Sequence, residues 1–295
     1  MPSLKEVKNR INSVNSTRKI TSAMKMVASA KLHSAQKSIE SMRPYESRLG
    51  RIMSTFVSTI DGDITSPYAV ERPAQRVALV VFTSNSSLCG AFNGNVVKEL
   101  RSVVRHYEEK GSEVVAVYPL GKKGAEAVRK LGFETKDYAS LLDHPAYAPA
   151  AEIAQELMDK FAAKEIDRVE LIYHHFKSAG SQILMREQFL PVCFDEEAAE
   201  GVKAESSEGG FLNDYIVEPS KEELIVKLIP KSLHLKLYTA LLDSLASEHA
   251  ARVIAMQVAT DNADELLHDL TLQYNKTRQQ AITAELLDIV GGSMQ

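Results

Sequence analysis

Each end of this chain carries an unusually long stretch with a helical pattern. In the first, from Ser3 to about Ile60, apolar residues recur every three or four positions and no glycine occurs before Gly50. The second covers 231–290, with no proline and no glycine until Gly291. At 1.5 Å per residue the first stretch would be roughly 80 Å long, far longer than one globular domain needs. The sequence therefore predicts two long terminal helices.

The spacing also predicts which residues form the seam between two such helices. The positions in the first stretch are Leu4, Val7, Ile11 and Val14 and, after a polar gap, Met24, Val27, Leu32, Ile39, Met42, Leu49, Met53 and Phe56. Those in the second are Leu242, Leu245, His249, Arg252, Met256, Ala259, Ala263, Leu266 and Leu270. Small seam residues let two backbones approach closely, and polar ones can fix register. Pro44 is the one irregularity expected in the first helix.

The two ends carry opposite charge. Residues 1–60 hold eleven Lys or Arg and three acidic residues, a net charge of +8. Residues 232–295 hold four cations and eight acidic residues, a net charge of −4. A basic segment can indicate nucleic-acid binding or a transit peptide. The acidic bias of the other end favours two helices that lie antiparallel, so the basic residues are interpreted as a solvated or partner-helix face.

Between the helices the period changes to that of an α/β domain. Short β-branched runs, typical of buried parallel strands, begin at Arg76, Glu113 and Arg168. Helical patterns lie near 94–110, 121–131 and 149–164. This alternation predicts an α/β domain with a parallel sheet, inserted near the foot of the helical hairpin. Segments 181–194 and 211–220 are predicted to be added strands or edges, and 195–210 a surface loop.

Composition bounds the class of protein. Hydrophobic residues make up 44% and charged residues 25%, as in a soluble globular protein. No run approaches the roughly 18 apolar residues of a membrane span, and the N-terminus has no signal-peptide pattern, so secretion is not expected. Cys89 and Cys193 form neither a disulfide framework nor a metal-ligand spacing, which favours a reducing compartment.

Two loops at strand ends are candidate anion sites. The segment 83–95 follows the first predicted strand, where doubly wound sheets bind ligands, but it matches no phosphate-binding motif, so a structural turn is the favoured reading. Cys89 within it is read as a buried small residue rather than a nucleophile. Lys122 and Lys123 are expected at a helix N-terminus, where an anion could bind, although Gly121 and Gly124 are explained as turn residues.

No pattern in the sequence indicates a catalytic centre. The adjacent His174 and His175 point to opposite faces of a strand, so they are read as structural rather than as ligands of one metal. Glu248, His249 and Arg252 lack the order of a zinc-protease motif and are read as a polar cluster in the seam. We expect no catalytic residue, no cofactor and no metal.

Three segments together carry a family resemblance. "KNRINSVNSTRKITSAMKMVASAKL" (8–32), "LCGAFN" (88–93) and the run from "LASEHAARVIAM" to "LLDIVGG" (245–292) resemble the gamma subunits of F-type ATP synthases. The resemblance covers essentially the whole chain. It implies a left-handed, antiparallel coiled coil of the helices 1–60 and 220–295, which form a hairpin shaft, and an inserted Rossmann-like α/β foot domain over 61–219.

The resemblance also implies a function and a set of partners. Similar proteins are non-catalytic central-stalk rotors inside a ring of alpha and beta subunits, and they couple ion-driven rotation of the c-ring to conformational change at the beta-subunit catalytic sites. Their partners are the alpha and beta subunits, the epsilon subunit and the c-ring, with no nucleic acid. The implied location is peripheral, on the cytoplasmic face of the cell inner membrane, and the implied role includes regulation of ATPase activity and ion flow.

Positions that match the family motifs are expected to contact the beta subunits. They are Met24, Lys25, Arg252, Arg278, Gln279, Thr283 and Glu285. The chain departs from the family in the loop before "LCG", where Asn85 and Ser87 stand in place of a common Asp and Gly, and in the ending "GGSMQ" in place of a Gly-Ala run.

Overall fold

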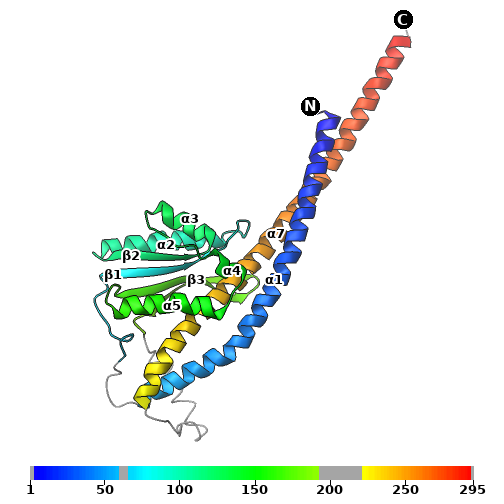
Figure 1. Ribbon diagram of the computed structural model, residues 1–295. Helices are drawn as coiled ribbons and strands as arrows, with labels where there is room; N and C mark the ends of the chain where they lie inside the picture. Colours follow the sequence, from blue (N-terminus) through cyan, green and yellow to red (C-terminus); the bar gives the residue numbers. More distant parts are fainter. Residues whose placement is uncertain (1–2, 60–65, 193–220, 294–295) are drawn as a thin grey trace. The chain divides into compact units, whose positions relative to one another are not determined.

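The computed structural model describes residues 3–59, 66–192 and 221–293, drawn in colour in Figure 1. The helices are α1 (Leu4–Thr59), α2 (Phe92–Glu109), α3 (Lys122–Lys130), α4 (Ala139–Asp143), α5 (Tyr147–Ala162) and α7 (Lys221–Ser293). The strands are β1 (Arg76–Phe82), β2 (Glu113–Leu120), β3 (Arg168–Ser178) and β4 (Ser181–Leu190). The chain forms two compact units, Met1–Ala30 with Arg252–Gln295 and Lys31–Ala251, so each of the two long helices contributes to both.

The larger unit is built on a four-stranded sheet in the order β2-β1-β3-β4. β1 pairs in parallel with β2 and with β3, and β4 pairs antiparallel with β3. The predicted parallel sheet is thus confirmed for three strands, and the added strand predicted from residue 181 is confirmed as an antiparallel edge. The predicted strand 211–220 and loop 195–210 lie outside the described residues, as does Cys193.

β1 separates the two halves of the core. Ala78, Val80 and Phe82 face a cluster formed with α5 and the first part of α7, whereas Val77, Leu79 and Val81 face a cluster formed with α2. This alternation follows from the period of two along a strand, and both faces are apolar because helices cover both (Figure 1).

The larger unit also contains a paired section of the two long helices. Leu32 and Ile39 of α1 pack with Leu242, Ala246 and Ala250 of α7. α7 begins at Lys221 and continues through Pro230, so one helix covers both the stretch predicted over 231–290 and the residues just before it, which the implied helix 220–295 also includes. Burial of neighbouring residues such as Ile229 in the core holds this first part in place despite the lost backbone hydrogen bond. α1 likewise continues through Pro44.

In the smaller unit α1 and α7 run antiparallel, as three polar contacts between them establish. Arg18 contacts Asp264, Thr21 contacts Thr260, and Lys25 contacts Gln257, so the residue number falls along α7 as it rises along α1. Figure 1 shows the two helices of this unit side by side. The predicted combination of an α/β domain with long antiparallel helices is therefore confirmed. No helix in the described ranges is long and apolar enough to span a membrane.

The seam of this unit differs from the predicted one in three places. The predicted polar gap is part of the seam, because Thr21 is buried there. Val27 is 59% exposed and the adjacent Ala28 is buried. Leu266 is 48% exposed, and the adjacent Leu267 is half-buried instead. The steps of four and three residues continue along α1 through polar positions, so hydrophobicity alone selected the wrong neighbours.

Candidate functional site

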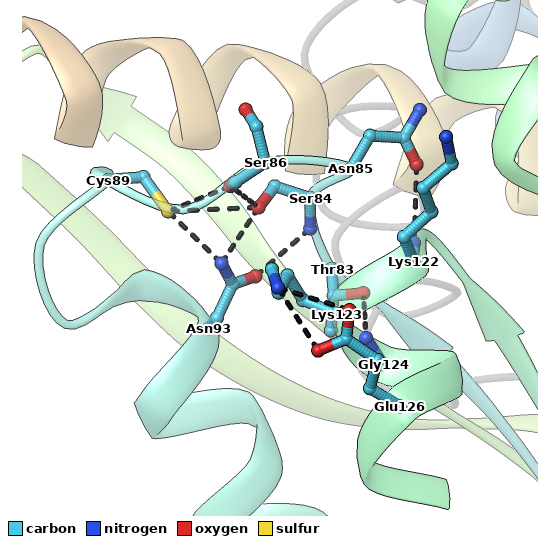
Figure 2. Close-up of polar contacts among 10 residues, drawn as sticks. All are labelled: Thr83, Ser84, Asn85, Ser86, Cys89, Asn93, Lys122, Lys123, Gly124 and Glu126. Atoms are coloured by element: carbon cyan, nitrogen blue, oxygen red, sulfur yellow. Dashed lines mark hydrogen bonds and ion pairs between the residues drawn. The ribbon is translucent and has the colours of Figure 1, made fainter. Parts of the chain in front are cut away.

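The loop after β1 is closed by its own side chains (Figure 2). Asn93, in the first turn of α2, accepts a hydrogen bond from the backbone N–H of Ser84 through Oδ1 at 3.0 Å. Its Nδ2 donates to Ser84 Oγ at 2.7 Å and lies 3.1 Å from Cys89 Sγ. Ser84 Oγ in turn donates to the carbonyl of Ser86 at 2.5 Å. Cys89 is 1% exposed, so the prediction of a buried small residue is confirmed.

The N-terminus of α3 is occupied by the same loop. Its first three backbone N–H groups belong to Lys122, Lys123 and Gly124. They donate, in that order, to Asn85 Oδ1 at 3.2 Å, the Ser84 carbonyl at 3.1 Å and Thr83 Oγ1 at 2.8 Å. These N–H groups are the ones that would bind an anion at a helix N-terminus. The structural reading of both loops is therefore favoured, because the loop itself supplies the acceptors.

Two glycines allow this close approach. Gly121 has φ of 117°, and a Cβ there would lie 2.5 Å from the Thr83 carbonyl oxygen. Gly121 is a turn residue, as predicted, but Gly124 lies inside α3. A Cβ on Gly124 would lie 2.7 Å from Thr83 Oγ1, so this glycine is required by helix–loop contact rather than by a turn.

Asn85, one of the two departures from the family pattern, uses both ends of its amide. Its Oδ1 accepts from the N–H of Lys122, and its Nδ2 donates to the Ala139 carbonyl at 2.8 Å and to Asp143 Oδ1 at 3.1 Å. An aspartate could accept here but, when ionised, could not donate. Asn85 therefore links the loop to both α3 and α4.

His174 and His175 point to different surroundings, as expected from their adjacent positions on β3. The His174 ring is 3% exposed and stacks on Phe92, with centroids 4.5 Å apart. Burial lowers the pKa of His174 to about 4. His175 Nδ1 instead lies 2.7 Å from Asp243 Oδ2 of α7. Within the described ranges, no group of three or more His, Cys, Asp or Glu side chains could hold a metal ion.

The polar cluster predicted in the seam of α7 is buried or half-buried, as expected of seam residues. Glu248 is 6% exposed and Arg252 is 8% exposed, whereas His249 is half-buried.

The residues expected to contact beta subunits all lie in the smaller unit, in two groups. Met24, Lys25 and Arg252 belong to its paired section, where Met24 and Lys25 are half-buried and Arg252 is buried. The second group is exposed and belongs to the last part of α7; it consists of Arg278, Gln279, Thr283 and Glu285. Contacts of both groups with beta subunits stay predictions.

The last part of α7 extends past the beginning of α1, as the smaller unit in Figure 1 shows. Its large apolar side chains are exposed; they are Ile282, Leu286, Leu287, Ile289 and Val290, with exposed fractions between 49% and 68%. The paired section also exposes large apolar residues on its outside, namely Ile20, Met26, Val27, Ile254, Val258, Leu266 and Leu272. We call these two sets together the outer apolar surface. Exposed apolar residues in such number indicate an interaction surface.

The polar residues that join the two helices of the paired section could not be predicted as contacts from the sequence. Thr21, Gln257 and Thr260 are ordinary polar residues on long helices, so their type alone does not indicate a contact between the helices. The only available signal was their spacing, since Thr21 falls at a seam position seven residues from Val14 and from Ala28.

Comparison with known proteins decides the family. A family model described as "ATP synthase" matches residues 3–294. The chain belongs to the ATP synthase family. It is 60% identical to the ATP synthase gamma chain of Bacteroides fragilis over the whole of both chains. It is 46% identical to that of Flavobacterium johnsoniae over 99% of this chain and 98% of the relative.

Solved ATP synthase structures share the fold. A chain of the Euglena gracilis mitochondrial ATP synthase, from a structure titled "OSCP/F1/c-ring, rotational state 3", matches with a TM-score of 0.64 at 20% identity and covers 99% of this chain and 93% of its own. A chain of the Tetrahymena thermophila central stalk and c-ring matches with a TM-score of 0.57 at 24% identity, over 81% and 99%.

The resemblance to gamma subunits of F-type ATP synthases is confirmed, together with the function of a central-stalk subunit that it implies. The chain is part of an ATP synthase, an enzyme complex associated with a membrane.

Proposed function

We propose that this chain is the non-catalytic rotor shaft of its ATP synthase. Proton or sodium flow through a c-ring in the membrane turns the chain. Its turning changes the conformation of the beta-subunit catalytic sites, where ATP forms, and thereby regulates both ATPase activity and ion flow. The complex places it on the cytoplasmic face of the cell inner membrane, as a peripheral subunit.

The observation that carries this proposal is the outer apolar surface. Ordinary paired helices bury their large apolar residues between them, whereas here Ile20, Met26 and Val258 are 51% to 65% exposed while Thr21 and Ala28 are buried. A long apolar surface exposed to water is unfavourable and requires cover. A sleeve of alpha and beta subunits would provide that cover along the paired section and the last part of α7.

Two kinds of contact with the beta subunits follow. Met24, Lys25 and Arg252 would meet acidic loops of beta, and the basic character of α1 suits such loops. Arg278, Gln279, Thr283 and Glu285 would meet the loop and bearing that surround the last part of α7. Exposed ion pairs contribute only about 0–1 kcal/mol each, so contacts of this kind break and re-form as the shaft turns.

The larger unit would contact the remaining partners, the epsilon subunit and the c-ring.

Coupling of rotation to the catalytic sites depends on the asymmetry of this chain. A single chain inside a ring of three equivalent sites presents a different surface to each, so each site has a different preference between open and closed forms. That difference in binding free energy is what shifts nucleotide affinity from site to site.

Co-purification tests the proposal. A tagged copy of this chain, expressed in a cell that makes its ATP synthase, is expected to bring down alpha, beta and epsilon subunits together with ATPase activity. Recovery of the tagged chain free of alpha and beta subunits would contradict the proposal. A tagged chain with the apolar residues Leu286, Ile289 and Val290 changed to serine serves as a comparison, because loss of tip contacts should weaken recovery without affecting the larger unit.

A further inference from the structure

The paired section of the smaller unit is joined by a row of polar contacts, which we call the polar ladder. It consists of Arg18, Thr21 and Lys25 on α1 and of Asp264, Thr260 and Gln257 on α7. The α1 residues are three and four positions apart, and the α7 residues are four and three apart. This is the spacing of seam positions in a coiled coil, so the ladder occupies the interface itself.

The middle contact of the polar ladder is the most buried. Thr21 is 9% exposed, and its Oγ1 lies 2.8 Å from Oγ1 of Thr260. Each hydroxyl also has an acceptor on its own helix, since Thr21 reaches the Arg18 carbonyl at 3.0 Å and Thr260 reaches the Met256 carbonyl at 2.8 Å. Two protons serve three possible bonds, so one hydroxyl donates across the interface while the other donates to its own backbone.

The outer contacts of the polar ladder are charged and more exposed. Arg18 Nη1 lies 2.9 Å from Asp264 Oδ1, with side chains 40% and 53% exposed. Lys25 Nζ donates to Gln257 Oε1, and Gln257 Nε2 donates to Asp261 Oδ1 at 2.7 Å. The glutamine amide therefore connects the Lys25 ammonium to a carboxylate on α7.

The apolar contacts beside the middle of the polar ladder are small. Ala28 and Ala263 are buried there and each brings a single methyl group, while the larger buried Met256 lies toward one end of the ladder and Val7 and Leu270 lie beyond the other. The larger Ile20, Val27 and Val258 are exposed on the outside. Non-directional contacts between methyl groups change little when one helix slides or turns against the other, whereas hydrogen bonds are lost.

A shift of one heptad removes the middle contact. In the observed alignment Thr21 faces Thr260. Displacement of α7 by seven residues would place Thr21 opposite Leu267 in one direction and Val253 in the other, and neither can accept or donate a hydrogen bond. Buried polar pairs are known to specify register in coiled coils for this reason.

We propose that the polar ladder sets the alignment of α1 and α7 and holds it while torque passes along the shaft. Thr21 and Thr260 are its principal positioning residues, and Gln257 positions Lys25. The torque part of this proposal rests on the proposed function, whereas the alignment part concerns the chain alone.

Two double variants test the alignment. Thr21→Val with Thr260→Val removes both hydroxyls without changing size. Thr17→Val with Thr271→Val is the matched control, because these exposed threonines bond only to the carbonyls of Ser13 and Leu267 on their own helices. Hydrogen–deuterium exchange of the full chain is expected to accelerate about tenfold over residues 14–28 and 253–267 in the first variant and to stay unchanged in the control. Equal exchange in the two variants would overturn the proposal.

A charge exchange adds a readout specific to pairing. Arg18→Asp and Asp264→Arg are each expected to accelerate exchange in these segments, and the two together are expected to restore the wild-type rate. Absence of that rescue would also count against the proposal.

In the assembled complex, the first valine variant is expected to hydrolyse ATP but to pump at least twofold fewer ions per ATP than the control. If this variant pumps as many ions per ATP as the control although its hydrogen–deuterium exchange is accelerated, the polar ladder sets the alignment of the helices but has no role in passing on torque. A wild-type chain that never joins the complex would instead contradict the proposed function, without affecting the exchange result.

Discussion

Thr83 Oγ1 accepts a hydrogen bond from the backbone N–H of Gly124 at 2.8 Å, across a gap that leaves no space for a side chain on the glycine. A Cβ at Gly124 would lie 2.7 Å from this oxygen and 3.1 Å from Thr83 Cγ2. This contact joins the residue that follows β1 to the first turn of α3, within the group of residues shown in Figure 2.

Gly124→Ala is therefore expected to destabilise the larger unit by about 1–3 kcal/mol, because a buried helix and loop would have to separate. Chemical denaturation of the full chain measures the change. Gly94→Ala is the control, since a Cβ at this helical glycine meets nothing within 4 Å and is expected to stabilise by about 0.5–1 kcal/mol. Thr83→Ala combined with Gly124→Ala should recover part of the loss. Equal effects of the two glycine variants would contradict the contact.

Asn85→Asp is expected to destabilise by about 1–3 kcal/mol at pH 7. The new carboxylate could not donate to the Ala139 carbonyl and would be repelled by Asp143, which now accepts a hydrogen bond from Asn85. The loss should shrink as the pH falls toward 4, because a protonated carboxyl is neutral and can donate. Asn85→Ala loses the same bonds without adding charge, so its effect should not depend on pH. Denaturation across this pH range distinguishes the two variants.

His174 is expected to make the larger unit sensitive to acid. Burial lowers its pKa from 6.5 to about 4, so the unfolded chain binds a proton at this residue at a higher pH than the folded chain. The contribution of His174 to the free energy of unfolding therefore has its full value above pH 6.5, and it decreases progressively as the pH falls toward 4. The loss amounts to about 3 kcal/mol.

His174→Phe, which keeps an aromatic ring against Phe92, removes the titrating group. The difference in unfolding free energy between this variant and the wild type should change over pH 4–6.5 and be constant above it. A difference that is independent of pH throughout would show that His174 is not buried in its neutral form.

Removal of residues 279–295 tests the last part of α7. The paired section does not need these residues, because the pairing of Arg18 with Asp264 places the start of α1 at Leu4 near Arg278. The truncated chain is expected to be recovered with alpha and beta subunits in lower yield than the full chain, as for the serine variant. The complexes that still form are expected to couple ATP hydrolysis to ion pumping less well. Ion pumping into inverted membrane vesicles measures the coupling. Full proton- or sodium-linked synthesis by the truncated complex would contradict this prediction.

Helices and strands that depend on the local spacing of apolar residues could be predicted from the sequence. The strands at Arg76, Glu113 and Arg168 and the helices between them follow from alternation and turn residues, and the two terminal helices follow from spacing and the absence of glycine. Opposite net charges predicted the antiparallel pairing, and Arg18 and Asp264 form an ion pair between the two helices in the smaller unit.

Contacts between segments that are far apart in the chain could not be predicted from the sequence. Whether Leu266 or Leu267 faces α1 depends on how α7 is rotated about its own axis against α1. The 3.6-residue period of a helix does not decide between two adjacent positions. Likewise, nothing near Gly124 in the sequence indicates that Thr83 lies against it. The contacts expected of Met24, Lys25 and Arg252 with beta subunits are implied by the family resemblance, and they stay predictions.

Rotation of this chain within its complex is the central part of the proposed function. The complex is fixed to a surface through its beta subunits, a visible marker is attached to the larger unit of this chain, and ATP is added. We predict that the marker turns continuously in one direction and stops when ATP is removed. ATP hydrolysis at the normal rate with a stationary marker would contradict the central claim.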